Sequence, residues 1–159
     1  MKQTMQIAML SLLITAIIAA FSCKKNNNDN VVPKKTKTEL ITAGSWKRTA
    51  LISTPAYDWN ANGISDTNVL NIMFPCEKDN FETYYSNGTV VTNEGPSKCY
   101  ASDPQTWTVA WRLADNETKL IWDVDDEYTL IELSETTLKF KSTFVENGVS
   151  YTHVETYGH

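Results

Sequence analysis

Hydrophobic and polar residues alternate along much of the chain after residue 45, with the period of two that is typical of half-buried β-strands. In the segment 46–53 the even-numbered residues from Trp46 to Ile52 fall on one face, and Leu51 falls on the other. Further strands are predicted at 80–86, 89–93, 107–113, 119–124, 128–133, 138–145 and 149–157.

Short polar turns join most of these segments. Asn87-Gly88 is the strongest hairpin signal, because this dipeptide suits the left-handed backbone of a two-residue turn. Short connections force neighbouring strands to run antiparallel. The sequence therefore predicts an all-β fold, an antiparallel up-and-down meander that closes into a barrel of about eight strands. The segment 68–74 lacks alternation and is predicted to form a short helical turn across one barrel end.

The N-terminus has the features of a targeting segment. A run of apolar or small residues from Ile7 to Phe21 is too short for a typical membrane span and fits the core of a signal peptide. Ala20-Phe21-Ser22-Cys23 resembles a bacterial lipobox, in which the cysteine becomes the acylated N-terminus. We therefore expect a lipoprotein signal peptide at 1–22 and a lipid anchor on Cys23. The alternative is an ordinary secretory signal cleaved nearby.

Charge divides the rest of the chain. Residues 23–38 are predicted to be a flexible basic tether, with five lysines and one aspartate from residue 24 onward. Residues 39–159 form the predicted domain, with 18 acidic and 8 basic residues. An acidic domain on a basic tether suits a protein anchored beside anionic lipid in the cell envelope, either periplasmic or surface-exposed. The acidic domain excludes nucleic acid as a partner, since phosphate contacts need a basic surface.

Motifs of catalysis are absent from the sequence, which contains no G-x-S-x-G, no phosphate-binding glycine loop and no H-E-x-x-H. His153 and Glu155 share a strand face, where they would form a hydrogen-bonded pair, a proton relay or the solvated edge of a last strand. The acids Asp123, Asp125, Asp126 and Glu127 are expected at a solvated hairpin tip. We therefore predict that the protein is not an enzyme.

One loop resembles a calcium site. Oxygen-bearing groups recur at alternate positions, as in calcium loops, and Gly63 takes the position of the sharp turn. The candidate ligands are Asp58, Asn60, Asn62, the carbonyl of Ile64, and Asp66. Val69 stands where such a loop usually carries a bidentate glutamate, so any calcium binding would be weak. The alternative is an Asx-rich turn. No other cofactor is expected.

Three tryptophans on adjacent predicted strands, Trp107, Trp111 and Trp122, are candidates for ligand contact. An eight-stranded barrel is either filled by side chains or holds one small ligand. The same tryptophans would form the core of a filled barrel.

Cys76 and Cys99 remain once Cys23 is assigned to lipid. Two cysteines in an exported domain favour a disulfide. Two free thiols or half a metal site are the alternatives.

Several stretches resemble the lipocalin-like domain of small Bacteroidetes lipoproteins. They are GSWK at 44–47, CEKDNFETYYSNGT at 76–89, NEGPSKC at 93–99, SDPQTWTVAWRL at 102–113 and LIELSETTLKF at 130–140. The resemblance implies a lipocalin-type barrel, a disulfide between Cys76 and Cys99, and a role in binding or interaction with no established catalysis.

The stretch Gly44-Ser45-Trp46 is also similar to the G-x-W of true lipocalins. The resemblance implies that Trp46 closes one barrel end beneath a cation from a late strand, which here would be Lys139 or Lys141. Two functions follow for the domain. The first is a binding module for a small apolar or amphipathic molecule. The second is a filled barrel that acts as a structural or interaction subunit with another envelope protein.

Overall fold

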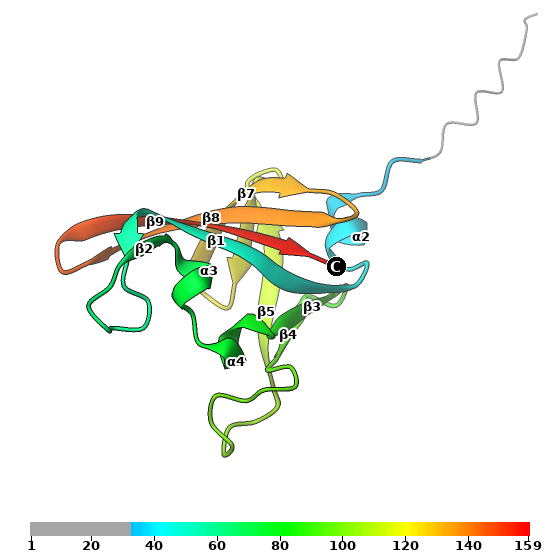
Figure 1. Ribbon diagram of the computed structural model, residues 1–159. Helices are drawn as coiled ribbons and strands as arrows, with labels where there is room; N and C mark the ends of the chain where they lie inside the picture. The colour runs from blue at the N-terminus through cyan, green and yellow to red at the C-terminus, as the bar shows by residue number, and fades with distance from the viewer. Residues whose placement is uncertain (1–32) are drawn as a thin grey trace, which may run out of the picture. The chain divides into compact units, whose positions relative to one another are not determined.

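The computed structural model describes residues 33–159, of which Lys34–His159 form one compact unit. Eight antiparallel strands follow one another in chain order and close into a barrel, because the first also pairs with the last (Figure 1). This confirms the predicted fold class. The strands are β1 (Ser45–Tyr57), β3 (Phe81–Tyr85), β4 (Thr89–Asn93), β5 (Thr106–Ala114), β6 (Lys119–Trp122), β7 (Asp126–Leu133), β8 (Thr137–Glu146) and β9 (Val149–Gly158).

Strand β1 is the seam of the barrel. Its first residues pair with β3, its middle pairs with β9 from Lys47 to Thr54, and its far end pairs with the short β2 (Asp66–Asn68), which the sequence did not predict. A β-bulge between Arg48 and Ala50 interrupts the pairing with β9. A bulge adds one residue to one strand, so the face that points inward changes from even to odd numbers.

Because of the bulge, part of the predicted assignment of residues to the two faces of β1 does not hold. Trp46 is buried as expected, but beyond the bulge Leu51 is 1% exposed while Ile52 is 40% exposed. The assignment of Ile52 to the face of Trp46 was therefore wrong, because strict alternation was assumed across a bulge that the sequence does not announce.

One barrel end is closed by α2 (Lys37–Ile41) and by Trp46. The helix begins at Thr36, whose hydroxyl accepts a hydrogen bond from Glu39 N while the Glu39 carboxylate accepts one from Thr36 N. The indole Nε1 of Trp46 donates to the carbonyl of Ile41 at 2.7 Å, and both residues are fully buried. The helix thus covers the barrel end, and it includes residues assigned to the tether by the sequence.

The partner of Trp46 is the last residue of the chain. The His159 ring lies over the Trp46 ring with centroids 3.9 Å apart, and its Nδ1 donates to the Ser45 carbonyl at 2.9 Å. The expectation of Lys139 or Lys141 at this place was wrong, because these two alternate with the buried Leu138 and Phe140 and therefore face outward. A Cβ on Gly44 would lie 3.0 Å from the His159 ring, so a larger residue there would require the ring to shift.

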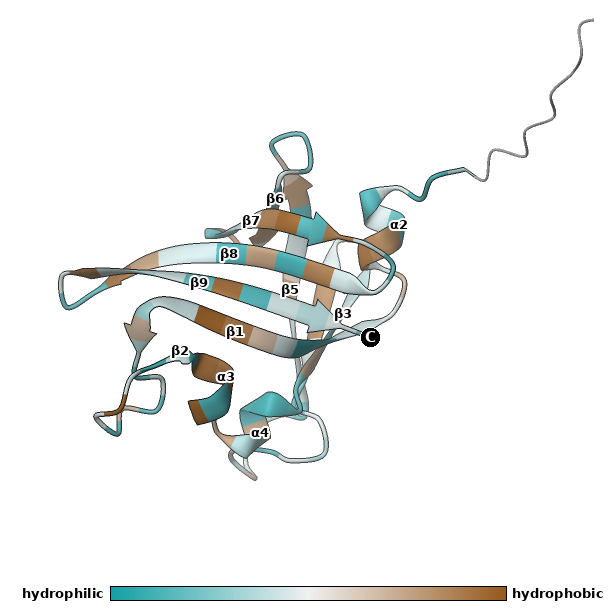
Figure 2. Cartoon of the chain, turned by 45° about the horizontal axis from the view of Figure 1, so that its top comes forward, coloured by the Kyte–Doolittle hydropathy of each residue, from teal (hydrophilic) through white to brown (hydrophobic). Residues whose placement is uncertain are grey.

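Two apolar clusters form the core. The larger contains Ile41, Trp46, Tyr84, Val90, Trp111, Leu120, Leu138, Phe140 and Tyr157. The smaller joins β1 to α3 (Val69–Ile72) through Leu51, Val69 and Met73. Each large apolar side chain contributes about 1.5–3 kcal/mol when it is fully buried. Figure 2 shows hydrophobic and hydrophilic bands alternating along β1, β8 and β9, as expected of strands with one buried face.

The connection from β1 to β3 carries α3 and α4 (Pro75–Lys78), and both lie away from α2 in Figures 1 and 2. The predicted helical turn at 68–74 is thereby confirmed as α3. None of the helices within residues 33–159 is both long and apolar enough to cross a membrane.

The loop after β4 is fastened to α4. Cys76 of α4 and Cys99 of the loop form the predicted disulfide, with Cα atoms 5.2 Å apart. Asp79 accepts a hydrogen bond from Ser97 N at 3.1 Å. Gly95 has a φ of +69°, and a Cβ there would lie 2.5 Å from the Asp79 carbonyl oxygen. Only glycine allows this close approach.

Replacing Gly95 with alanine should lower the free energy of unfolding by roughly 2–4 kcal/mol, because strain at positive φ adds to the overlap with Asp79. Gly148 is the matched control, with a φ of +79° and nothing within 4 Å of the added Cβ. Gly148→Ala should lose only about 1 kcal/mol. Equal losses in denaturant unfolding would show that the contact between Gly95 and Asp79 does not hold the loop.

Candidate functional site

A cavity of about 230 Å³ opens inside the barrel at the end that faces α3 and α4. Its wall crosses three adjacent strands, because Glu82 pairs with Thr92 and Thr92 pairs with Trp107. Directly paired residues place their side chains on one face of a sheet. Arg48 of β1 and Trp122 of β6 complete the wall, and Trp59 and Met73 from the connection border the mouth. We call this space the barrel cavity.

A network of charged and hydroxyl groups crosses the seam of the barrel. Arg48 Nε donates to Glu155 Oε2 at 2.8 Å, and Arg48 Nη2 donates to Tyr157 Oη at 2.9 Å. The Tyr157 hydroxyl donates in turn to Glu155 Oε2 at 2.7 Å. The Arg48 and Glu155 side chains are only 20% and 13% exposed. Arg48 therefore has its charge balanced by Glu155 inside the barrel.

Glu82 is a buried carboxyl group in the wall of the barrel cavity. It is 5% exposed, and its Oε2 has no hydrogen-bond partner among the described residues. Burial raises the pKa of Glu82 to about 8, with Glu155 adding to this effect and Arg48 opposing it. A buried carboxyl group with such a pKa in a cavity is a candidate for ligand recognition.

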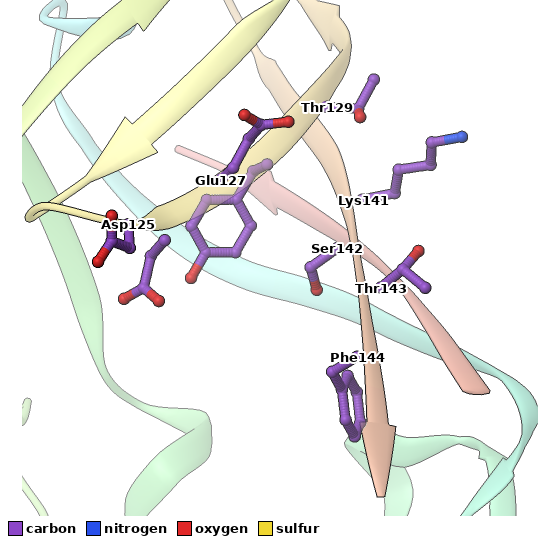
Figure 3. Close-up of a pocket in the computed structure, with 9 residues that line it drawn as sticks. Asp125, Glu127, Thr129, Lys141, Ser142, Thr143 and Phe144 are labelled. Atoms are coloured by element: carbon purple, nitrogen blue, oxygen red, sulfur yellow. The ribbon is translucent and has the colours of Figure 1, made fainter. Parts of the chain in front are cut away.

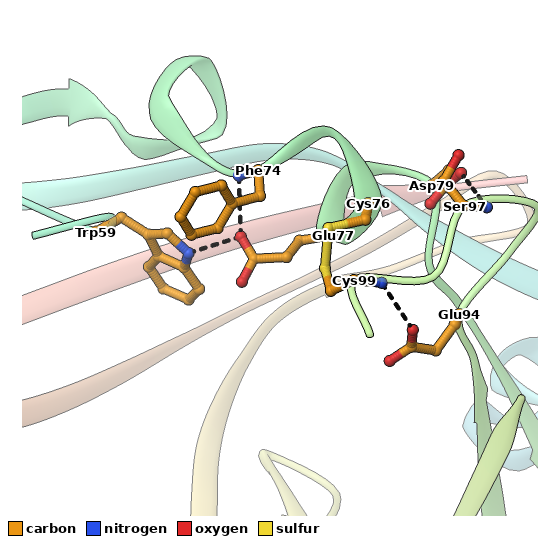
Figure 4. The surroundings of a disulfide bond; sticks show 8 residues. All are labelled: Trp59, Phe74, Cys76, Glu77, Asp79, Glu94, Ser97 and Cys99. Atoms are coloured by element: carbon orange, nitrogen blue, oxygen red, sulfur yellow. Dashed lines mark hydrogen bonds between the residues drawn. A yellow bond between two sulfur atoms is a disulfide. The ribbon is translucent and has the colours of Figure 1, made fainter. Parts of the chain in front are cut away.

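The cavity mouth is held by Glu77 of α4. Its Oε2 accepts from Trp59 Nε1 at 2.9 Å and from Phe74 N at 3.0 Å (Figure 4). Glu77 follows Cys76, so the disulfide fastens the short helix that positions Trp59. Figure 4 shows Trp59 and Phe74 on one side of Glu77 and the disulfide on the other.

The three predicted tryptophans have different surroundings. Trp107 and Trp122 line the barrel cavity. Trp111 is 7% exposed and belongs to the core, where its ring meets Tyr84 edge-on at 5.3 Å and its Nε1 donates to the Tyr85 carbonyl. Sequence reasoning missed Arg48, Trp59 and Glu82. The Asn87-Gly88 signal could not reveal Glu82, because a two-residue turn would pair it with Asn93, whereas the observed loop pairs Tyr85 with Thr89 and Glu82 with Thr92.

His153 and Glu155 share one face of their strand, as predicted, and that face points into the barrel. Their strand β9 pairs on both sides, so the interpretation as a solvated edge was wrong. His153 is 6% exposed and lies among Tyr57, Phe144 and Trp59, with ring centroids 5.2, 4.8 and 6.2 Å away. Burial lowers the pKa of His153, so the ring is neutral near pH 7.

Side-chain oxygens of the loop at 58–66 accept hydrogen bonds from nearby backbone N–H groups. Asp58 accepts from Asn62 N at 3.1 Å and from Gly63 N at 2.8 Å, and Asn62 Oδ1 accepts from Ile64 N. Asp66 accepts from Asn68 N, and Asn60 donates to the Ile72 carbonyl. These are the bonds of an Asx-rich turn. Residues 33–159 contain no group of three or more His, Cys, Asp or Glu that could hold a metal ion. Calcium binding by this loop stays a prediction.

A second hollow, of about 560 Å³, lies where β7 and β8 separate beyond the pair Thr129 and Lys141. Figure 3 shows Asp125 and Glu127 on one side of it and Ser142 and Phe144 on the other. We call it the acidic hollow. Three of the four acids predicted at a solvated hairpin tip, Asp125, Asp126 and Glu127, line this hollow, and all four are exposed at the turn between β6 and β7 as expected. Tyr128, which also lines it, meets Trp122 of the barrel cavity with ring centroids 5.6 Å apart.

Comparison with known proteins finds likeness at the level of structure. No protein-family model and no curated protein sequence matches the chain. The solved structure of a deswapped triple mutant of bovine odorant-binding protein is similar to it, with 16% identity over 73% of this chain and 72% of that chain and a TM-score of 0.41.

Glu82 should make stability depend on pH. The folded protein keeps the Glu82 proton up to about pH 8, whereas the unfolded chain releases it near the ordinary pKa of 4.5. The stability of the wild type relative to Glu82→Gln should therefore fall as pH rises between about pH 5 and pH 8, by at most about 1.4 kcal/mol per pH unit. Denaturant unfolding of both proteins across this range measures the difference, and other titrating groups cancel in it. Parallel pH profiles would mean that Glu82 titrates normally.

Proposed function

We propose that the domain binds a small molecule inside its barrel, without catalysis, and that a lipid on Cys23 anchors it in the bacterial cell envelope. The observation that carries the binding role is the barrel cavity, in which three tryptophan rings and a buried carboxyl group without a hydrogen-bond partner for its Oε2 border about 230 Å³ of space. Aromatic walls with a few polar groups are typical of small-molecule sites.

The proposed anchor is supported by the sequence. The apolar run that ends in Ala20-Phe21-Ser22-Cys23 and the basic tether are the features of a lipoprotein. The resemblance to the lipocalin-like domain of Bacteroidetes lipoproteins supports the same location. Cys23 and the signal segment lie outside the described residues.

The alternative function is a structural or interaction subunit with a filled barrel. The nine-residue core cluster favours it, because these side chains occupy much of the interior. The cavity is also smaller than the roughly 300–1,000 Å³ usual for ligand sites. Binding experiments separate the two functions.

Probe binding tests the proposed pocket. Phenethylamine, phenethyl alcohol and phenylacetate share one aromatic skeleton and differ in charge, and at least one should quench the fluorescence of the cavity tryptophans. Thr92→Phe, which places a ring in the cavity, should weaken that binding by about tenfold or more, equivalent to about 1.4 kcal/mol. Calorimetry confirms the affinities.

The control is Thr108→Phe, which adds the same ring at an exposed position of β5. It should leave binding unchanged. Trp107→Ala serves as a second cavity variant if Thr92→Phe does not fold by circular dichroism. The proposed binding role fails if none of the three probes binds, or if binding is indifferent to changes in the cavity, and the filled-barrel function is then favoured.

Replacing Cys23 with serine tests the anchor. The serine variant cannot be acylated through a thiol, so it should move from the membrane pellet to the soluble fraction, and mass spectrometry should show the loss of the lipid from the N-terminal peptide. The control is the double variant Cys76→Ser, Cys99→Ser, which removes two cysteines and leaves the lipobox intact. This variant should stay in the membrane pellet. Retention of the Cys23 variant in the pellet after a high-salt wash would contradict the anchor.

A further inference from the structure

The charges around the barrel cavity specify what kind of molecule it accepts. We infer that the cavity takes a small organic cation, an amine whose ammonium group meets the Glu82 carboxylate and whose apolar part lies among Trp59, Trp107 and Trp122. This inference rests on the proposed function and names the ligand class of the same site.

The first argument is the count of charges. Arg48 is the cationic residue in the cavity wall, and its Nε already makes the 2.8 Å ion pair with Glu155. Two further carboxyl groups, Glu77 and Glu82, border the same space. An anionic ligand would be repelled by both carboxylates when they are ionised, while Arg48 is already paired with Glu155. A cationic ligand would stabilise the ionised form of Glu82, which burial otherwise disfavours, because a buried charge is stable only when it is paired.

The second argument is the aromatic wall. Tryptophan has the ring face that attracts cations most strongly, and cages of aromatic rings beside a carboxylate are how proteins recognise ammonium groups. Glu77 fixes Trp59 through its indole N–H, so that ring is held at the cavity mouth by a hydrogen bond of 2.9 Å. Trp107 and Trp122 stand on the neighbouring strands β5 and β6.

The third argument is size. A cavity of about 230 Å³ has roughly the volume of eight water molecules. That space fits a single ring with a short side chain and excludes a long acyl chain. The ligand class is therefore a compact amine.

The surface outside the cavity favours the same charge. The domain from residue 39 onward carries 18 acidic and 8 basic residues. Asp125, Asp126 and Glu127 line the acidic hollow, and Tyr128 of that hollow contacts Trp122 of the barrel cavity. A surface of one sign raises the local concentration of ligands of the opposite sign.

The inference predicts a preference within the probe series. Near pH 8, phenethylamine should bind about tenfold more tightly than phenethyl alcohol, and phenylacetate should bind least. Glu82→Gln should remove the preference for the amine and leave the affinity for the alcohol within about twofold, because only the charge is lost. Glu132→Gln, which removes the same charge from an exposed position on β7, is the matched control and should keep the preference.

The pH dependence distinguishes a direct charge contact from a general effect of shape. Three charged groups, Arg48, Glu155 and Glu77, lie near Glu82. Three tyrosines interact with it as well, and burial raises the pKa of each, so they stay protonated over this range: Tyr84, Tyr128 and Tyr157. His153, whose pKa is lowered by burial, is already neutral above pH 7. The amine stays charged up to about pH 10, as lysine does. Its affinity should therefore rise between about pH 6.5 and pH 8.5 as Glu82 ionises, and this rise should vanish in Glu82→Gln.

Each outcome of the series has one meaning. Alcohol binding that equals or exceeds amine binding, and that Thr92→Phe abolishes, overturns the cation inference while the binding function stands. Tightest binding of phenylacetate assigns the site to anions through Arg48 and also overturns it. Binding of no probe overturns both. A preference for the amine that survives in Glu82→Gln shows that Glu82 is not its partner.

Discussion

The pairing of β1 with β9 is the constraint on which the molecule depends. It turns a meander into a barrel without free edges, which is how antiparallel sheets avoid exposed strand edges. The bulge after Arg48 lies within this pairing, so Trp46 and Arg48 face the interior before it and Leu51 and Ser53 do so after it. The contact with α3 follows from that irregularity in β1, because the bulge turns Leu51 inward against Val69 and Met73.

The interior contains charges that a filled barrel would not need. Replacing a buried ion pair by apolar side chains is often neutral or stabilising, so the network of Arg48, Glu155 and Tyr157 is weak evidence for a purely structural role. Glu82 adds a carboxyl group whose ionisation is opposed by burial. Keeping these polar groups beside the cavity lowers the stability of the barrel. The same groups stand where they could recognise a ligand.

The strands were predictable because alternation and turn chemistry act locally. Predicted and observed bounds agree within two residues for most strands, and β4 agrees at both ends. The β1 bulge, β2 and the partner of Trp46 were not predictable, because each depends on a distant segment. The site was predicted in part. Trp107 and Trp122 stand out as large aromatic residues, whereas Arg48 and Glu82 have the polar identity of outward-facing positions, and only the closed barrel shows that they point inward.

The disulfide acts on the cavity through a single residue. Cys76 and Cys99 join α4 to the loop after β4, and Gly95 allows that loop to approach Asp79. A helix of four residues has little stability of its own, since helix formation has a costly nucleus. The covalent link therefore provides what the hydrogen bonds of α4 cannot, a fixed position for Glu77. Through the Glu77 carboxylate, the same link fixes the indole of Trp59 at the mouth of the barrel.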